Sequence, residues 1–323
     1  MSPTPVTVLT GFLGAGKTTL LNRILSSDHG LRIGVLVNDF GAINIDEQLI
    51  VGMDDSTISL ANGCVCCEID DDLIGAIETM IERNERPDYI LLEASGIADP
   101  FGIAMTVGNR RFEDTIRLDG IISVVDVEQI FAHPEYPALL DLKLRQIGNS
   151  DMVVLNKVDL VDADQVARVH EWIDERIPRV RTYETSYADV PLEILLGVGG
   201  FAVATREPST SDHSHNEHGF ESWSYESDAP LSLDALRDTI KRLPGSIFRC
   251  KGIVHTPGDS KPIVIQSVGR RSTFTQTAPE SSVDSTSRIV VIGASGTLDP
   301  IDLRTQFDNC IASADLLVAR SAG

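Results

Sequence analysis

The stretch GFLGAGKTT, residues Gly11–Thr19, decides the fold. It follows an alternating apolar run at Val6 and Val8 and leads into apolar residues at helical spacing. The sequence therefore predicts a strand, a glycine-rich loop and a helix. The order G-x-x-x-x-G-K-[ST] is typical of a phosphate-binding loop, and the alternative is a glycine-rich turn that merely precedes a helix.

The residue types in this loop suit a phosphate ligand. Glycines without a Cβ let backbone N–H groups surround phosphate oxygens at the start of the helix. Lys17 is expected between the terminal phosphates, the Thr18 hydroxyl on a magnesium ion, and Thr19 on the innermost phosphate. The predicted nucleotide-binding residues of this loop are Gly11, Gly14, Ala15, Gly16, Lys17, Thr18 and Thr19.

Length and composition indicate two domains. The chain has 323 residues, which exceeds the usual size of a single domain, and 42% of them are hydrophobic, enough for a core in each of two domains. We expect a P-loop NTPase domain over residues 1–205, an α/β fold with a doubly wound, mostly parallel sheet. A linker over 206–219 and a smaller α+β domain over 220–323 should follow, with its last helix over 300–312.

The net charge of −21 argues against two classes of partner, because a field of this sign repels nucleic-acid phosphates and anionic membranes. No run of eighteen apolar residues predicts a membrane span, and the first residues do not resemble a secretory signal. We therefore expect a cytoplasmic protein. Its five cysteines are an odd number with three of them crowded together, which favours thiol or metal chemistry over disulfides.

The tetrad Asn156-Lys157-Val158-Asp159 at a strand end predicts the base. Guanine presents two adjacent donors that one carboxylate, here Asp159, can accept, whereas adenine presents an acceptor and a donor. Asn156 would brace the loop, and the Lys157 stem would lie over the ring. Ser186 is a further expected base contact. GTP is favoured, and an ATP-dependent, kinase-like enzyme is the alternative.

Three further residues are candidates for sensing the terminal phosphate. Asp39 follows a buried strand and could reach the magnesium through water, or it could be an ordinary turn residue. Glu93 ends a strand beside the phosphate loop, where an acid that reaches the magnesium through water is expected; the alternative is a helix cap. Gly96 could place its N–H near the terminal phosphate.

The run Asn62-Gly-Cys-Val-Cys-Cys-Glu68 is the second informative stretch. Cys64, Cys66 and Cys67 are close enough to be soft ligands of one metal ion, and Zn(II) and Cu(I) both prefer sulfur ligands. Three ligands leave a tetrahedral site open, as release of a metal requires. A buried apolar trio and a redox pair of Cys64 with Cys67 remain as alternatives.

The linker carries His213, His215 and His218 in a segment without apolar periodicity. Neutral imidazoles at this density can gather loosely held metal ions, which would make the linker an auxiliary metal site. A solvated spacer explains the same composition.

The order of these motifs resembles the CobW-like GTPases, of the CobW/HypB/UreG-type group of P-loop GTPases that serve metalloenzyme maturation. The resemblance covers essentially the whole chain and is most specific where the phosphate loop is paired with Gly63-Cys-x-Cys-Cys67 and with Glu93. It implies a GTPase whose nucleotide state controls delivery of zinc, or of cobalt, to a client metalloprotein.

Other functions remain open at this stage. The chain could be a metal buffer in which the nucleotide is only structural, or an accessory GTPase of cobalamin biosynthesis. No residue that would position the hydrolytic water is identifiable in the sequence, so slow turnover is expected, with acceleration by a client or by a homodimer.

Overall fold

The computed structural model describes residues 3–38, 57–60, 69–83, 85–178, 180–196, 220–257, 259, 261–269, 271–276 and 286–312. Within these ranges, none of the helices combines the length and apolar character that a membrane crossing requires. The chain divides into two compact units, Met1–Ala202 and Val203–Gly323.

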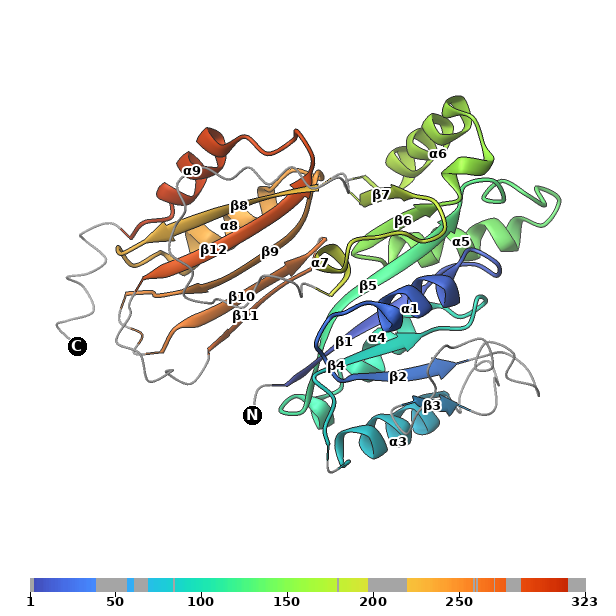
Figure 1. Cartoon of the computed structure of the whole chain (residues 1–323), viewed down its shortest axis with the longest axis horizontal. Helices are drawn as coiled ribbons and strands as arrows, with labels where there is room; N and C mark the ends of the chain where they lie inside the picture. The colour runs from blue at the N-terminus through green and yellow to red at the C-terminus, as the bar shows by residue number, and fades with distance from the viewer. Residues whose placement is uncertain are drawn as a thin grey trace. The chain divides into compact units, whose positions relative to one another are not determined.

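The first unit contains a seven-stranded sheet of order β3-β2-β4-β1-β5-β6-β7 (Figure 1). Every neighbouring pair is parallel, which goes beyond the mostly parallel sheet expected from the sequence. The strands are β1 (Thr4–Thr10), β2 (Ile33–Asn38), β3 (Thr57–Leu60), β4 (Tyr89–Glu93), β5 (Ile116–Asp126), β6 (Met152–Asn156) and β7 (Arg181–Thr185).

The crossover connections make this sheet doubly wound. The connections are α1 (Lys17–Ser26), α3 (Ile69–Ile81), α4 (Pro100–Val107), α5 (Pro137–Gly148) and α6 (Ala163–Arg176), with a short α7 (Leu192–Leu195) after the last strand. The α1 crossover runs toward β3, whereas the crossovers through α3 to α6 run toward β7. Right-handed crossovers in opposite directions place their helices on opposite faces of a sheet, so the predicted doubly wound architecture is confirmed.

Two apolar clusters pack the helices from α3 to α6 against the sheet. Leu73 and Ile77 of α3 pack with Val8 of β1 in one cluster. Ile147 of α5 and Ile173 of α6 belong to a second cluster with residues of β5 and β6. A strand that is buried on both faces has a nearly continuous run of apolar residues, and β4 and β6 show this pattern.

All carboxyl ends of a parallel sheet lie at one edge, and polar residues gather there. Thr10 leads from β1 into the glycine-rich loop, and Glu93, Asp126 and Asn156 are the last residues of β4, β5 and β6. The order reverses about β1, with β4 and β5 on its two sides. Open α/β sheets bind ligands at such a switch point.

The described part of the second unit is an antiparallel sheet of order β11-β10-β9-β12-β8 with two helices, which confirms the predicted α+β class. Apolar residues of the sheet and both helices form its core. The elements are β8 (Phe220–Ser227), α8 (Leu233–Arg242), β9 (Ile247–Val254), β10 (Ile263–Val268), β11 (Arg271–Gln276), β12 (Ser287–Ala294) and α9 (Pro300–Asp308).

Helix α9 is shorter than the sequence predicts. It begins after Asp299, whose side chain caps it by accepting from the N–H groups of Ile301 and Asp302. It ends at Asp308 instead of 312, because the chain then turns and Ile311 forms a β-bridge with Leu231. Cys310 and Ala312 are buried in this turn while Ile311 is exposed, and periodicity does not distinguish this arrangement from a last helical turn.

Candidate functional site

The loop after β1 requires its glycines. Gly11, Gly14 and Gly16 have φ values of 134°, 73° and 108°, a left-handed region that favours glycine. A Cβ on Gly11 would overlap the carbonyl oxygen of Val124, and a Cβ on Gly16 would overlap the side-chain amide of Asn156. The loop therefore packs closely against β5 and β6, and α1 begins directly after it.

Lys17 and Thr18 begin α1 with their side chains in distinct surroundings. Lys17 is 6% exposed, and its Nζ donates to the carbonyl oxygen of Phe12 at 3.4 Å, so the ammonium is folded over its own loop. Thr18 is half-buried, Ala15 is buried and Thr19 is exposed. This start of a helix, with a lysine beside it, is an anion-binding arrangement.

Thr18 and Glu93 are directly bonded. The Thr18 Oγ1 donates to Oε1 of Glu93 at 2.8 Å, although the residues are 75 positions apart. Glu93 is 2% exposed and stands at the end of β4, in register with Leu9 of β1. Asp99, and not Glu93, is the N-cap of α4. The capping alternative for Glu93 is therefore wrong.

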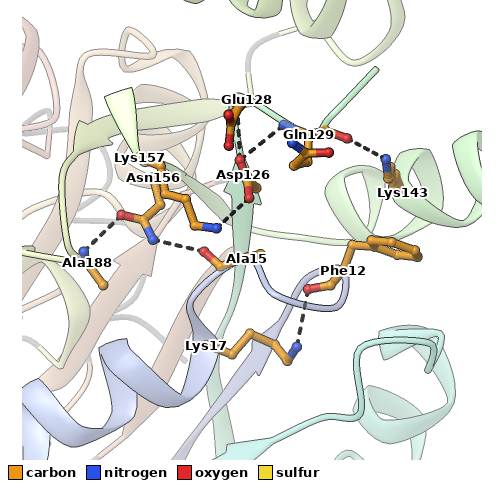
Figure 2. A network of polar contacts seen from close by, with 10 residues as sticks. All are labelled: Phe12, Ala15, Lys17, Asp126, Glu128, Gln129, Lys143, Asn156, Lys157 and Ala188. Carbon is orange, nitrogen blue, oxygen red and sulfur yellow. Dashed lines mark hydrogen bonds and ion pairs between the residues drawn. The ribbon is translucent and has the colours of Figure 1, made fainter. Parts of the chain in front are cut away.

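Asn156 links two loops that are far apart in the sequence. Its Nδ2 donates to the carbonyl oxygen of Ala15 at 2.9 Å, and its Oδ1 accepts from the N–H of Ala188 at 2.9 Å (Figure 2). Asn156 is buried, so both bonds are shielded from water. The Asn156 side chain thus joins the glycine-rich loop to the segment after β7, which is the kind of bracing expected of it.

Lys157 pairs with an acid that the sequence did not single out. Its backbone is left-handed, with φ of 67°, and its Nζ lies 2.6 Å from Oδ2 of Asp126. The other oxygen of Asp126 accepts from the N–H groups of Glu128 and Gln129 (Figure 2). The sequence signal that could have found it is an acid at the end of β5, the strand next to β6, which ends at Asn156 just before Lys157.

Asp159 and Ser186 lie on the two loops that follow β6 and β7. Asp159 is exposed in a short 3-10 turn, Val158–Leu160. After Ser186, Tyr187 and Ala188 have φ values of 54° and 55°, two successive left-handed residues that cost energy.

Arg23 stabilises this strained turn. Its Nε donates to the carbonyl oxygen of Tyr187 at 2.7 Å, and its Nη1 pairs with Asp189 at 2.9 Å. Because Arg23 belongs to α1, the turn after β7 is fastened to the helix that follows the glycine-rich loop. Sequence reasoning missed this arginine, which carries no local motif.

Lys143 of α5 supports the loop from the side. Its Nζ donates to the carbonyl oxygens of Gln129 and Ile130, and it lies 4.9 Å from the centre of the Phe12 ring (Figure 2). Burial lowers the pKa of Lys143, while the negative charge of Asp126 opposes that shift. This cation is a structural brace, held by backbone oxygens and an aromatic face.

The predicted metal residues fall outside the described ranges: Asp39, Cys64, Cys66, Cys67, His213, His215 and His218. Within the described part of the chain, no group of three or more His, Cys, Asp or Glu side chains is arranged to hold a metal ion.

The fold and these loops define the class of P-loop GTPases. The family model for the CobW/HypB/UreG nucleotide-binding domain matches residues 5–184, and that for the cobalamin synthesis protein cobW C-terminal domain matches residues 220–311. The chain belongs to the CobW/HypB/UreG family, as the order of its motifs predicted.

Relatives of known name cover nearly the whole chain. The zinc chaperone CobW of Sinorhizobium sp is 32% identical over 90% of this chain and 92% of its own length. The zinc chaperone YjiA of Escherichia coli strain K12 is 30% identical over 84% of this chain and 87% of its own. The crystal structure of Zn(II)-bound YjiA GTPase from E. coli is 26% identical, with a TM-score of 0.47, over 97% of this chain and 100% of that one.

Proposed function

We propose that this protein is a GTP-hydrolysing zinc chaperone, which binds zinc through Cys64, Cys66 and Cys67 and delivers it to a client metalloprotein. The observation that carries the proposal is the meeting of three groups at one sheet edge: the glycine-rich loop, the Thr18–Glu93 pair and the Asn156–Asp159 segment. The names of the two zinc-chaperone relatives support the choice of metal.

The phosphates of GTP would occupy the loop at the start of α1. Its backbone N–H groups and the Lys17 ammonium supply positive charge to the terminal phosphates. A hydroxyl and a carboxylate are hard oxygen ligands, so Thr18 and Glu93 fit magnesium. Thr18 would hold the ion and Glu93 would orient its hydration, while the ion itself neutralises phosphate charge.

The base would lie between the loops after β6 and β7. Asp159 accepts the two adjacent donors of guanine, and Ser186 contributes from the opposite loop. Lys157 is held by Asp126, which leaves its aliphatic stem to cover the ring. Asn156 sets the distance between the phosphate and base ends, because it bonds to both loops.

Hydrolysis of GTP by water gives GDP and inorganic phosphate, and it removes the group that Gly96 and Asp39 would contact. A ligand shifts a conformational equilibrium only through contacts that differ between its states, and the terminal phosphate supplies that difference here. Turnover by the isolated chain is slow in this proposal, and contact with a client or a second copy accelerates it.

Zinc is the cargo and would sit on the three thiolates, with the fourth position open for exchange. His213, His215 and His218 would gather zinc and pass it on. Cobalt is the alternative metal. Elemental analysis of the purified chain and of a variant with Cys64, Cys66 and Cys67 replaced by Ser tests this part. We expect about one zinc per chain, lost in the variant; an unchanged zinc content would contradict the thiol site.

The base assignment is tested by Asp159→Asn. Xanthine carries a carbonyl where guanine carries the exocyclic amine, so an Asn amide can pair with xanthine while Asp cannot. We expect the variant to lose about a hundredfold in GDP affinity, about 2.7 kcal/mol, and to gain affinity for xanthosine diphosphate. Asp162→Asn is the matched control, because Asp162 is the N-cap of α6 and accepts from the N–H of Gln165. Stronger binding of adenine nucleotides by the wild type would favour the kinase-like alternative.

Coupling between the two ligands separates a carrier from a buffer. Zinc affinity is measured by calorimetry with a non-hydrolysable GTP analogue bound and with GDP bound. A chaperone controlled by nucleotide state requires a difference of about fivefold or more. Equal zinc affinities in both nucleotide states would leave a metal buffer with a structural nucleotide.

A further inference from the structure

Helix α5 holds the segment that follows β4 through one buried side chain. The Nε2 of Gln146 donates to the carbonyl oxygens of Gly96 and Ala98, both at 3.1 Å. Gln146 is 1% exposed, so these bonds are made out of contact with water. A third bond lies within the segment itself, where the N–H of Ala98 donates to the carbonyl oxygen of Ser95.

Gly96 lies against the glycine-rich loop. A Cβ on Gly96 would fall 2.9 Å from the backbone nitrogen of Leu13, so no larger residue fits without displacing that loop. Glycine has more backbone freedom than any other residue, so contacts with neighbouring residues must fix its orientation. The N–H of Gly96 shares a peptide group with the carbonyl of Ser95, which accepts from the N–H of Ala98. Gln146 holds this turn through the carbonyl oxygens of Gly96 and Ala98.

The other contacts between α5 and this segment are weaker. Arg145 Nε lies 3.5 Å from Asp99 Oδ2, and Asn149 Nδ2 lies 3.4 Å from Asp99 Oδ1, both at exposed positions. Long, solvated contacts of this kind contribute little. The buried amide of Gln146 is therefore the main attachment of the segment to α5.

The orientation of the Gln146 amide follows from its partners. Two carbonyl oxygens can only accept, so the NH₂ group must face them and Oε1 must point elsewhere. Gln146 also lines a cavity of about 20 Å³ together with Phe12, Leu13, Ser123 and Lys143. The amide thus lies between the Gly96 segment and the residues that flank the glycine-rich loop.

We infer that Gln146 is a positioning residue for the terminal phosphate: it holds Gly96 so that the Gly96 N–H is preset toward the triphosphate, and it thereby sets the preference for GTP over GDP. This inference rests on the proposed function. A preset donor binds the terminal phosphate without the entropic cost of ordering a glycine. GDP lacks the terminal phosphate, so its affinity does not depend on this donor.

Gln146→Glu tests the inference in the full-length protein. The substitution keeps the size and shape of the side chain and places an acceptor against two acceptors. Affinities for a non-hydrolysable GTP analogue and for GDP are measured with magnesium present. We expect the analogue to bind about tenfold more weakly, about 1.4 kcal/mol, with GDP unchanged within about twofold. Gln146→Met removes the donor without adding a charge, and it serves if the Glu variant does not fold.

The matched control is Gln165→Glu. Gln165 also donates its amide to a backbone carbonyl in this unit, that of Val127, but on α6. Its substitution is expected to leave the ratio of the two affinities unchanged. Equal weakening of both nucleotides by the Gln146 variants, or no change in either, would overturn the inference while leaving the GTPase assignment intact. Failure of the wild type to bind guanine nucleotides would instead overturn both.

Discussion

The Nζ of Lys157 lies 2.6 Å from Oδ2 of Asp126, and this ion pair ties the loop after β6 to the end of β5. The two side chains are 31% and 10% exposed, so the pair is largely shielded from solvent. Asp126 is itself fixed by two backbone N–H groups. A lysine held in this way has a defined stem position, which is what a flat base needs above its face.

Replacing Asp126 by Asn should weaken GTP and GDP by the same factor. The change removes the charge that holds Lys157 but touches no phosphate contact, so we expect about a tenfold loss, about 1.4 kcal/mol, for both nucleotides. Fluorescent-nucleotide titration measures it. The control is Asp119→Asn, a buried acid of the same strand that binds Arg117 and Tyr89. A loss confined to GTP would contradict this role for Asp126.

The bond between Thr18 and Glu93 predicts how magnesium affects nucleotide binding. We expect Thr18→Ala and Glu93→Gln each to abolish most of the affinity that magnesium adds for a GTP analogue, on the order of tenfold. The double variant should lose little more than either single one, because the two groups act as a unit. Titrations with magnesium and with EDTA provide the comparison.

Thr79→Ala is the control for that experiment, since the Thr79 hydroxyl donates to the carbonyl oxygen of Gly75 in the preceding turn of α3. It should retain the full effect of magnesium. Independent, additive losses in the two site variants would argue against a shared ion.

Two glycines should respond to alanine in opposite directions. Gly16 has φ of 108° and a neighbour that a Cβ would overlap, so Gly16→Ala should abolish nucleotide binding and lower the free energy of unfolding. Gly75 is exposed in α3 with open space around its Cβ position. Gly75→Ala should raise the free energy of unfolding by about 0.5–1 kcal/mol through helix propensity. Urea denaturation checks both; a neutral Gly16 variant would contradict the loop geometry.

The second unit should lose stability in alkaline solution through Tyr225. This phenol is buried and donates to Asp308 at 3.0 Å; burial first, then the bond and charge of Asp308, raise its pKa to about 12. In an unfolded chain a tyrosine ionises near pH 10. Between about pH 10 and 12 the folded state therefore retains a proton that the unfolded state has lost, and stability falls as pH rises.

Trp223, whose ring centre is 6.1 Å from that of Tyr225, reports on this loss. With Trp172 replaced by Phe, urea unfolding followed by fluorescence should show a fall in the free energy of unfolding above pH 10. Tyr225→Phe should reduce the pH dependence, whereas Tyr136→Phe, at an exposed position, should not. Parallel curves for all three proteins would refute the assignment.

Local chemistry made much of this molecule predictable. The glycine-rich loop and the Asn156–Asp159 tetrad are runs of consecutive residues. The parallel pairing of β4 with β1 places Glu93 beside the loop that leads from β1 to Thr18. The doubly wound fold followed from the alternation of buried strands and helical segments. The family followed from the order of the motifs.

The residues that support the site were not predictable in this way. Gln146, Asp126 and Arg23 act through partners that are 31 to 166 positions away along the chain. From sequence alone, a polar residue in a helix is predicted to face solvent, because the sequence does not show which elements pack against it. Only tertiary structure shows that Gln146 is buried against two carbonyl groups.

The link from Ala15 through Asn156 to Ala188 spans nearly the whole first unit. During synthesis on the ribosome, the glycine-rich loop emerges early, but its brace emerges only after β6, and the second half of that brace only after β7. Asn156 can therefore join both loops only after the segment at Ala188 has left the exit tunnel, so the complete nucleotide site forms late in synthesis.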